Sequence, residues 1–224
     1  MKLYIANQNY SSWSLRAWLP FAQLGLDAEI IKLPLFTDTF YQTLASVTPA
    51  AKVPVLIDDE CQVWDSLAIL EYLNECHLDG KAWPQAVNAR AKARALACEM
   101  HSGFMALRNE MPMNCRATRD IALSPAALAD IRRIDDIWSE QMKAYPGQWL
   151  FGEWSMVDAM YAPVALRCRT YQIALSDAAT QYQQRVLHSP AILRWLAEAA
   201  SETDIVPEDE AGTPVFPEVG KAAI

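Results

Sequence analysis

Residues 48–56 read Thr-Pro-Ala-Ala-Lys-Val-Pro-Val-Leu and place a proline at the entry to a predicted interior strand, 53–57. A trans proline there would cost the sheet a ladder hydrogen bond, because proline has no N–H to donate. A cis bond between Val53 and Pro54 is a reasonable explanation. It would turn the N–H and C=O of Val53 outward, ready to pair with an extended peptide ligand.

The segments on both sides of this stretch alternate strand and helix patterns. Apolar alternation and helical spacing, with Gly25 as a helix end and 58–60 as a turn, set the boundaries. The predicted strands are Leu3–Ile5, 28–33, 53–57 and 61–64, and the predicted helices are 14–24, 37–45 and 66–76. The order is therefore βαβαββα.

Nearly everything from Trp83 to about Glu202 has a helical pattern. A long helix is predicted over 89–111, because Met100, Phe104, Leu107 and Met111 recur at helical spacing and Pro112 then stops it. Two further helix starts are predicted from Ser124-Pro125, where a cap precedes proline at the first helical position, and from the capping-box spacing of Ser155 and Asp158.

These patterns predict an α/β domain followed by an all-α domain. The segment 77–84 contains Asp79-Gly80 and Pro84, which suit a linker. We expect domains at 1–78 and 84–205, and an irregular tail at 206–224 that is rich in proline and acidic residues.

Composition limits the classes of partner. The chain has 224 residues and a formal net charge of −8, without a Lys/Arg cluster, which disfavours nucleic acid and anionic membranes as partners. The five cysteines are widely spaced and form no ligand cluster, so neither a disulfide framework nor a metal site is indicated. A reducing cytoplasm fits best.

Ser11 and Ser12 lie between the first strand and the first helix, where helix N–H groups point outward. A hydroxyl at such a position can hold a thiolate in preference to a thiol. The alternative is an ordinary N-cap, and Ser14 competes for that role.

Asp65 and Ser66 open another predicted helix. The Ser66 hydroxyl and the nearby N–H groups suit a carboxylate, and Asp65 suits an amine, so the pair fits an amino-acid head group. Simple helix capping is again the alternative.

Taken in order, these sites resemble the glutathione transferase family, which has a thioredoxin-like N-terminal domain and an all-helical C-terminal domain. The segment 11–16 (Ser-Ser-Trp-Ser-Leu-Arg) resembles the serine-type active-site segment, nearest to the zeta class of maleylacetoacetate isomerases. Residues 48–56 resemble the family's cis-proline segment, Asp65-Ser66 its acidic-Ser pair, and 151–159 its C-terminal capping motif.

The resemblance implies glutathione as co-substrate, no metal, and a homodimer. It implies that Ser11 or Ser12 stabilises the thiolate, that Val53 with Pro54 clamps the peptide, and that Trp13, Lys52, Asp65 and Ser66 complete the glutathione site. Trp13 replaces the zeta-class cysteine, which puts maleylacetoacetate isomerase activity in doubt and argues against mixed-disulfide chemistry.

His101 and Arg108 are seven residues apart on the predicted long helix, so they share nearly one face with Met105 nearby. In this fold that helix borders the cleft, and we expect these three residues to line the pocket of the second substrate. Arg108 could bind a carboxylate there and His101 could move a proton. The alternative is a solvated pair in which Arg108 bridges to Glu99 or Glu110.

The resulting hypothesis is a detoxifying glutathione transferase that joins glutathione to a small hydrophobic electrophile or uses it in isomerisation. A non-catalytic binding or regulatory protein on the same fold is the alternative, because fold does not fix function. Thiol reduction is a third hypothesis, and it would need Cys61 or Cys115 in the cleft.

Overall fold

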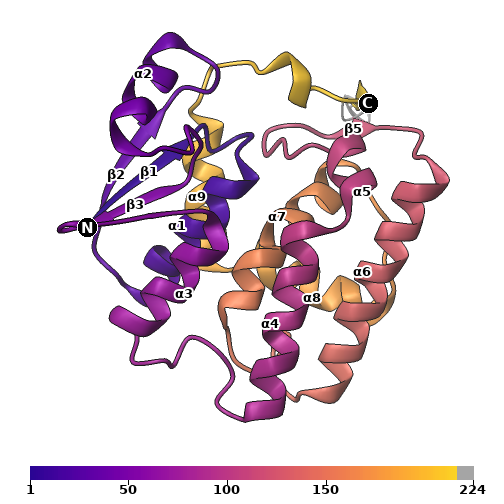
Figure 1. Cartoon of the computed structure of the whole chain (residues 1–224). Coiled ribbons are helices and arrows are strands. Elements are labelled where there is room, and N and C mark those ends of the chain that lie inside the picture. The colour runs from indigo at the N-terminus through magenta and orange to yellow at the C-terminus, as the bar shows by residue number, and fades with distance from the viewer. Residues whose placement is uncertain (216–224) are drawn as a thin grey trace, which may run out of the picture.

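The N-terminal part of the chain is a four-stranded sheet with helices on both faces (Figure 1). In the computed structural model, which describes residues 1–215, the strands run in the order β2-β1-β3-β4, with β1 parallel to β2 and antiparallel to β3. The elements are β1 (Lys2–Ala6), α1 (Ser12–Leu24), β2 (Glu29–Leu33), α2 (Asp38–Val47), β3 (Val55–Asp58), β4 (Cys61–Trp64) and α3 (Ser66–Cys76). The predicted thioredoxin-like order βαβαββα is confirmed.

Alternation along β1 explains why both sheet faces are covered. Leu3 and Ile5 belong to the main core with α1 and α3, whereas Ala6 packs with Phe40 and Leu44 of α2. Successive side chains of a strand point to opposite faces, so one short apolar strand anchors both layers.

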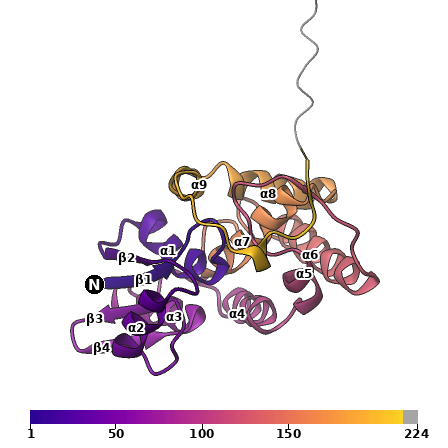
Figure 2. The same ribbon diagram turned by 90° about the horizontal axis from the view of Figure 1, so that it is seen from above.

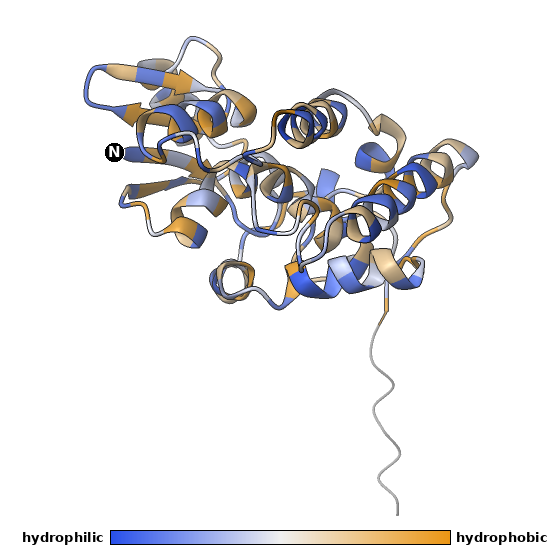
Figure 3. Cartoon of the chain, turned by 90° about the horizontal axis from the view of Figure 1, so that it is seen from below, coloured by the Kyte–Doolittle hydropathy of each residue, from blue (hydrophilic) through white to orange (hydrophobic). Residues whose placement is uncertain are grey.

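The rest of the chain is a bundle of helices (Figure 1). It consists of α4 (Val87–Ser102), α5 (Met105–Glu110), α6 (Pro125–Ala144), α7 (Met156–Thr170), α8 (Asp177–Leu187) and α9 (Pro190–Ala200). Helix α7 is its centre, since every residue of α7 except Arg169 is buried. Figure 3 shows apolar and polar residues alternating along the outer helices, as expected of helices with one buried face.

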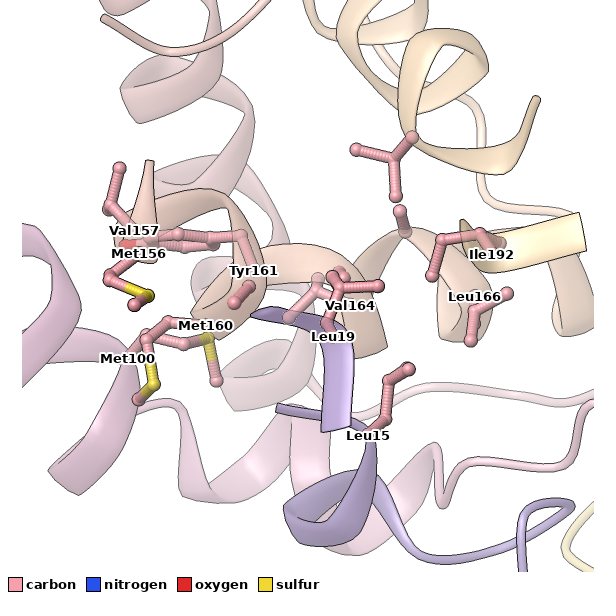
Figure 4. Packing of buried hydrophobic residues seen from close by; sticks show 14 of the residues in the cluster. Leu15, Leu19, Met100, Met156, Val157, Met160, Tyr161, Val164, Leu166 and Ile192 are labelled. Carbon is pink, nitrogen blue, oxygen red and sulfur yellow. The ribbon is translucent and has the colours of Figure 1, made fainter. Parts of the chain in front are cut away.

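Helices α1 and α7 join the two parts. Figure 4 shows Leu15 and Leu19 of α1 beside Val164 of α7, with Met160 of the same helix facing Met100 of α4. All five side chains are buried. Burying each such side chain contributes about 1.5–3 kcal/mol, so this contact fixes the N-terminus of α1 relative to the helical bundle.

The predicted long helix 89–111 is wrong at one point. The chain leaves the helix at Gly103, and Phe104 adopts a left-handed conformation with φ 57°, so two helices form. A Cβ on Gly103 would lie 2.6 Å from the carbonyl oxygen of Glu99, so only glycine fits this break. The predicted apolar stripe is nevertheless buried, because Phe104 and Leu107 still face the core.

The tail is more ordered than predicted. Residues 202–215, which we call the C-terminal strap, cross from α9 over the sheet domain toward the helical bundle (Figure 2). The strap contains a 3₁₀ helix, Pro207–Asp209, and a short strand, β6 (Thr213–Pro214), paired with β5 (Arg119–Asp120). The remainder of the predicted irregular tail, 216–224, lies outside the described residues, and the domain bounds 1–78 and 84–205 stay predictions.

No helix within residues 1–215 is long and apolar enough to span a bilayer.

The predicted capping box at the start of α7 is confirmed and supplies a stability test. The buried Asp158 carboxylate accepts hydrogen bonds from the N–H of Ser155 (2.8 Å) and of Leu150 (3.3 Å) and from the hydroxyl of Tyr182 (3.1 Å). Burial raises the pKa of Asp158 to about 7.

We expect Asp158→Ala to lower the free energy of unfolding by about 3 kcal/mol, because it removes a cap and leaves buried donors unpaired. Urea titration measures this. Asp177→Ala, an exposed first-turn aspartate of α8, is the control and should cost less than about 1 kcal/mol. Equal effects of the two substitutions would contradict the capping role.

Candidate active site

The N-terminus of α1 carries a short hydrogen-bond relay. Ser11 is the N-cap, and its Oγ lies 2.7 Å from the Oγ of Ser14 and accepts the N–H of Ser14 at 3.3 Å. The Ser14 Oγ accepts the N–H of Ala6 at 2.9 Å, so the Ser14 hydroxyl proton is available for Ser11. When Ser14 donates in this way, the Ser11 proton is free for a ligand.

Ser12 has a different environment. Its Oγ accepts a hydrogen bond from Nη2 of Arg167 at 3.2 Å, and Nε of Arg167 donates to the Met111 carbonyl at 2.7 Å. Both Ser12 and Arg167 are buried. The Ser12 hydroxyl is therefore hydrogen-bonded to a side chain of α7, whereas the Ser11 hydroxyl is hydrogen-bonded within α1.

The first cavity, of about 310 Å³, is bounded mainly by the sheet domain. Its walls are Trp13, Ala50, Lys52, Val53, Pro54, Trp64, Asp65 and Ser66. The predicted cis bond between Val53 and Pro54 is confirmed. Since β3 begins only at Val55, the N–H and C=O of Val53 lie outside the paired strands.

Two side chains at the start of α3 give this cavity its polar end. Asp65 caps the helix with φ 76°, and its carboxylate accepts the N–H of Leu67 at 2.9 Å. Such a conformation is costly for a residue with a side chain, and strain of this kind gathers at functional sites. Ser66 is fully buried, and its hydroxyl has no hydrogen-bond partner within residues 1–215. An unpaired buried hydroxyl in a cavity wall is suited to a ligand.

Two neighbouring cavities continue from the first. The connecting cavity, of about 310 Å³, has Ser11, Trp13, Lys52 and Val53 in its walls together with Leu35, Phe36, Phe40, Tyr41 and Ala51. The second cavity, of about 290 Å³, lies between the sheet domain and the bundle. Its walls are Tyr10, Ser11, Ser12, Trp13, Leu35, Phe36, Met105, Arg108, Asn109, Pro112, Met113, Arg167 and Asp209. Trp13 borders all three cavities, and Ser11 borders the latter two.

Positive charge is concentrated around Trp13. The guanidinium carbons of Arg16 and Arg108 each lie 4.5 Å from the Trp13 ring centroid, a cation–π distance. Burial lowers the pKa of Arg16, Arg108 and Arg167, in the last case to about 10, and the nearby guanidiniums lower those of Arg16 and Arg167 further. At neutral pH all three remain cations.

His101 is not where it was predicted. It is absent from the walls of the second cavity, and its Nε2 lies 3.3 Å from Oδ2 of Asp65 while its ring meets Trp13 edge-on. The break at Gly103 explains this, because His101 lies in the last turn of α4 whereas Met105 and Arg108 belong to α5. Arg108 donates to the His101 carbonyl at 3.0 Å, so the suggested bridge to Glu99 or Glu110 does not form.

Sequence reasoning missed three contributors to this site. Arg16 lies in an apolar helix pattern and is fully buried, with Nε donating to the Met160 carbonyl at 3.2 Å and both Nη atoms unpaired within residues 1–215. Arg167 follows the apolar run of α7, and Ser14 had been considered only as a competing cap. A charged residue inside an apolar helical run was the available signal for the two arginines.

Comparison with known proteins agrees with this architecture. Residues 10–76 match the family model of the glutathione S-transferase N-terminal domain. A probable maleylacetoacetate isomerase of Caenorhabditis elegans is 36% identical over 99 residues, which are 44% of this chain and 46% of that protein. The chain thus aligns with about half the length of this relative. Maleylacetoacetate isomerase of Rattus norvegicus is 28% identical over 80% of this chain and 82% of its own.

A solved glutathione transferase homologue from Burkholderia, with bound glutathione, superposes with a TM-score of 0.71 at 22% identity, over 90% of this chain and 98% of that one. The chain has the glutathione S-transferase fold. Its residues 10–76 match the N-terminal domain model of these transferases and its relatives include maleylacetoacetate isomerases, so the predicted resemblance to this family is confirmed.

The cysteines of this transferase fold take no part in the relay at Ser11. Cys61, Cys76 and Cys98 are exposed, while Cys115 and Cys168 are buried, and burial raises the pKa of each of these two thiols to about 12. None of the five borders the three cavities described. Thiol reduction through Cys61 or Cys115 therefore has no support in the geometry.

We expect three of the five cysteines to react rapidly with a disulfide reagent in the native protein and all five in denaturant, because only thiolates react and two thiols are buried. Counting the thiolate released from Ellman's reagent measures this. Rapid reaction of a fourth thiol in the native protein would show that Cys115 or Cys168 is accessible. Cys115→Ser and Cys168→Ser would identify which one.

Proposed function

We propose that this chain is a glutathione transferase enzyme that binds reduced glutathione across the first and connecting cavities. It joins the thiolate to a small electrophile in the second cavity, or uses the thiolate in an isomerisation. One observation carries the proposal: four kinds of polar group line the same two adjoining cavities. They are the strained Asp65 cap, the unpaired hydroxyl of Ser66, the unpaired backbone of Val53 and the hydroxyl relay at Ser11.

Each part of glutathione has a matching group. Asp65 suits the amine of the γ-glutamyl head and Ser66 its carboxylate, since the buried Ser66 hydroxyl otherwise lacks a partner. The backbone of Val53 suits the cysteinyl residue by strand-like pairing. Lys52, in the walls of both cavities, suits the remaining carboxylate.

We assign the thiolate to Ser11. Ser11 borders the connecting cavity beside Val53 and also opens on the second cavity, so a sulfur atom there would face both co-substrate and electrophile. The relay through Ser14 leaves the Ser11 proton free to donate. The cations Arg16, Arg108 and Arg167 add a positive potential, which favours a thiolate over a thiol.

The second cavity favours an electrophile with an apolar body and an anionic group. Phe36 and Met105 supply apolar walls, and Arg108 and Arg167 supply guanidiniums that suit a carboxylate. Nη1 of Arg167 is buried without a partner in the described part of the chain. A carboxylate in this cavity could accept a hydrogen bond from this unpaired guanidinium nitrogen.

We further propose the cytoplasm as the compartment and detoxification as the broad role. Three exposed free cysteines suit a reducing environment. A homodimer is proposed from the family, and the exposed apolar side chains Trp64 and Val87 are candidate contacts. Light scattering after gel filtration tests the assembly, and a monomeric mass at micromolar concentration would contradict it.

The first test is the ultraviolet absorbance of the bound thiolate against pH. We expect glutathione to ionise well below its pKa in water when bound to the wild type. Ser11→Ala should raise that pKa by about one to two units, because a hydrogen bond to a charged group contributes about 1.5–3 kcal/mol. Ser12→Ala should raise it less, since the Ser12 oxygen already binds Arg167.

The outcomes of this titration separate the alternatives. A larger shift with Ser12→Ala would move the thiolate to Ser12. An unshifted thiol in the wild type and both variants would favour a non-catalytic binding protein.

A second test concerns the glutathione head group. We expect Asp65→Asn to weaken glutathione binding by about tenfold or more, because it removes a charged partner of the amine. Calorimetry measures the affinity. Asp59→Asn, at an exposed position that also has positive φ, is the control and should bind as the wild type does. An unchanged affinity in Asp65→Asn would place the amine elsewhere.

A further inference from the structure

The C-terminal strap is held firmly at both of its ends. The Glu202 carboxylate accepts the N–H groups of Gln8 and Asn9 at 2.8 and 2.9 Å, immediately before the relay at Ser11. Farther along, Glu210 accepts the hydroxyl of Tyr10 at 2.6 Å and pairs with Arg119. The part of the strap between these anchors is therefore fixed over the cleft.

Between the anchors, the strap delivers one carboxylate into the second cavity. Asp209, the last residue of the 3₁₀ helix, is half-buried in the wall that also contains Ser12 and Arg167. Its side chain makes no hydrogen bond or ion pair within residues 1–215. Its neighbour Glu208 is exposed and does not border the cavity.

The charges that face Asp209 come from several elements. Arg167 of α7 and the phenol of Tyr171, the residue after α7, interact with it, and Arg108 of α5 shares the cavity wall. Glu208 and Glu210 flank it in the strap, where Glu210 is already paired with Arg119. Burial raises the pKa of Asp209, Arg167 opposes this rise and Glu208 adds to it, and the resulting pKa is about 6.

We infer that Asp209 is a specificity-determining residue of the second cavity, whose carboxylate opposes the binding of anionic ligands until it is protonated. The inference rests on the proposed role of this cavity but concerns binding alone and requires no turnover. An anion that approaches Arg167 also approaches Asp209, and two negative charges in one partly buried site repel each other. Binding of an anion should therefore be accompanied by uptake of a proton, whereas binding of a neutral ligand should not.

The direction of the pH dependence follows. Below about pH 6 Asp209 is mostly neutral and the arginines attract an anion without opposition. Above that pH the carboxylate is ionised, and protonating it has a cost that grows with pH. Anion affinity should fall by about sixfold between pH 5.5 and 7.5, the size that one pKa unit of coupling gives over this range for a group whose pKa is about 6.

The test compares two unreactive ligands of one skeleton on the full chain without glutathione. 3,5-Dinitrobenzoate is anionic at both pH values and 1,3-dinitrobenzene is neutral, and each should quench tryptophan emission because Trp13 is in the cavity wall. In the wild type, the ratio of anion affinity to neutral affinity should fall about sixfold from pH 5.5 to 7.5. In Asp209→Asn it should be high at both values.

Glu208→Gln is the matched control, since it removes the same charge one residue away and outside the cavity. The affinity ratio should still fall with pH in this variant, with the fall moved to slightly lower pH because Glu208 no longer raises the pKa of Asp209. A second measurement uses only the unaltered protein: calorimetry at pH 6.5 in two buffers of different ionisation enthalpy should show proton uptake with the anion and none with the neutral ligand.

Three results would overturn the inference: an affinity ratio independent of pH in the wild type, a ratio that still falls in Asp209→Asn, or binding of neither ligand. If the chain did not bind glutathione, the proposed function would be contradicted. The tests of Asp209 could still be interpreted, because they are made without glutathione.

Discussion

The contact between α1 and α7 is the constraint on which the rest of the structure depends. Leu15 and Leu19 bury one side of α1 against α7, and the Arg16 side chain crosses the same interface to the Met160 carbonyl. Because a packed interior does not adjust by small amounts, this contact sets where the first turn of α1 lies. That turn carries Ser11, Ser12 and Trp13, so the packing of α1 on α7 also positions the residues of the site.

Charge is the second organising feature. Three arginines lie around Trp13 and Ser12, and two of them have guanidinium nitrogens that no protein atom in residues 1–215 satisfies. Burying cations without partners is costly, and the proposed function requires an anionic ligand that would offset part of this cost. A thiolate and an anionic electrophile both fit that requirement. Asp209, the strap carboxylate that borders the second cavity with Arg167, then opposes the binding of a second anion until it is protonated.

Much of this could be read from the sequence because the signals were local. The order of strands and helices followed from periodicity and turn residues, and the cis bond followed from one proline at a strand entry. The break between α4 and α5 was missed, since the apolar stripe continues through Phe104 and only the clash of a Cβ at Gly103 with a carbonyl reveals it.

The missed parts of the site are contacts between residues that are far apart in the sequence, and spacing along the chain does not reveal such contacts. Arg167 reaches Ser12 across 155 positions, and Asp209 borders the cavity because long-range contacts, including those of Glu202 and Glu210, hold the strap in place. His101 lies in a helix, as the sequence predicts, but it contacts Asp65 instead of lining the second cavity. The chain changes direction at Gly103, so α5, and not the end of α4, borders that cavity.

We place glutathione along the first and connecting cavities with its sulfur at Ser11, and a crystal structure of the chain with glutathione tests this placement. We expect the sulfur within hydrogen-bonding distance of the Ser11 Oγ, the cysteinyl backbone paired with Val53, and the amine on Asp65. A tripeptide bound elsewhere, or bound with its sulfur directed away from both Ser11 and Ser12, would contradict it.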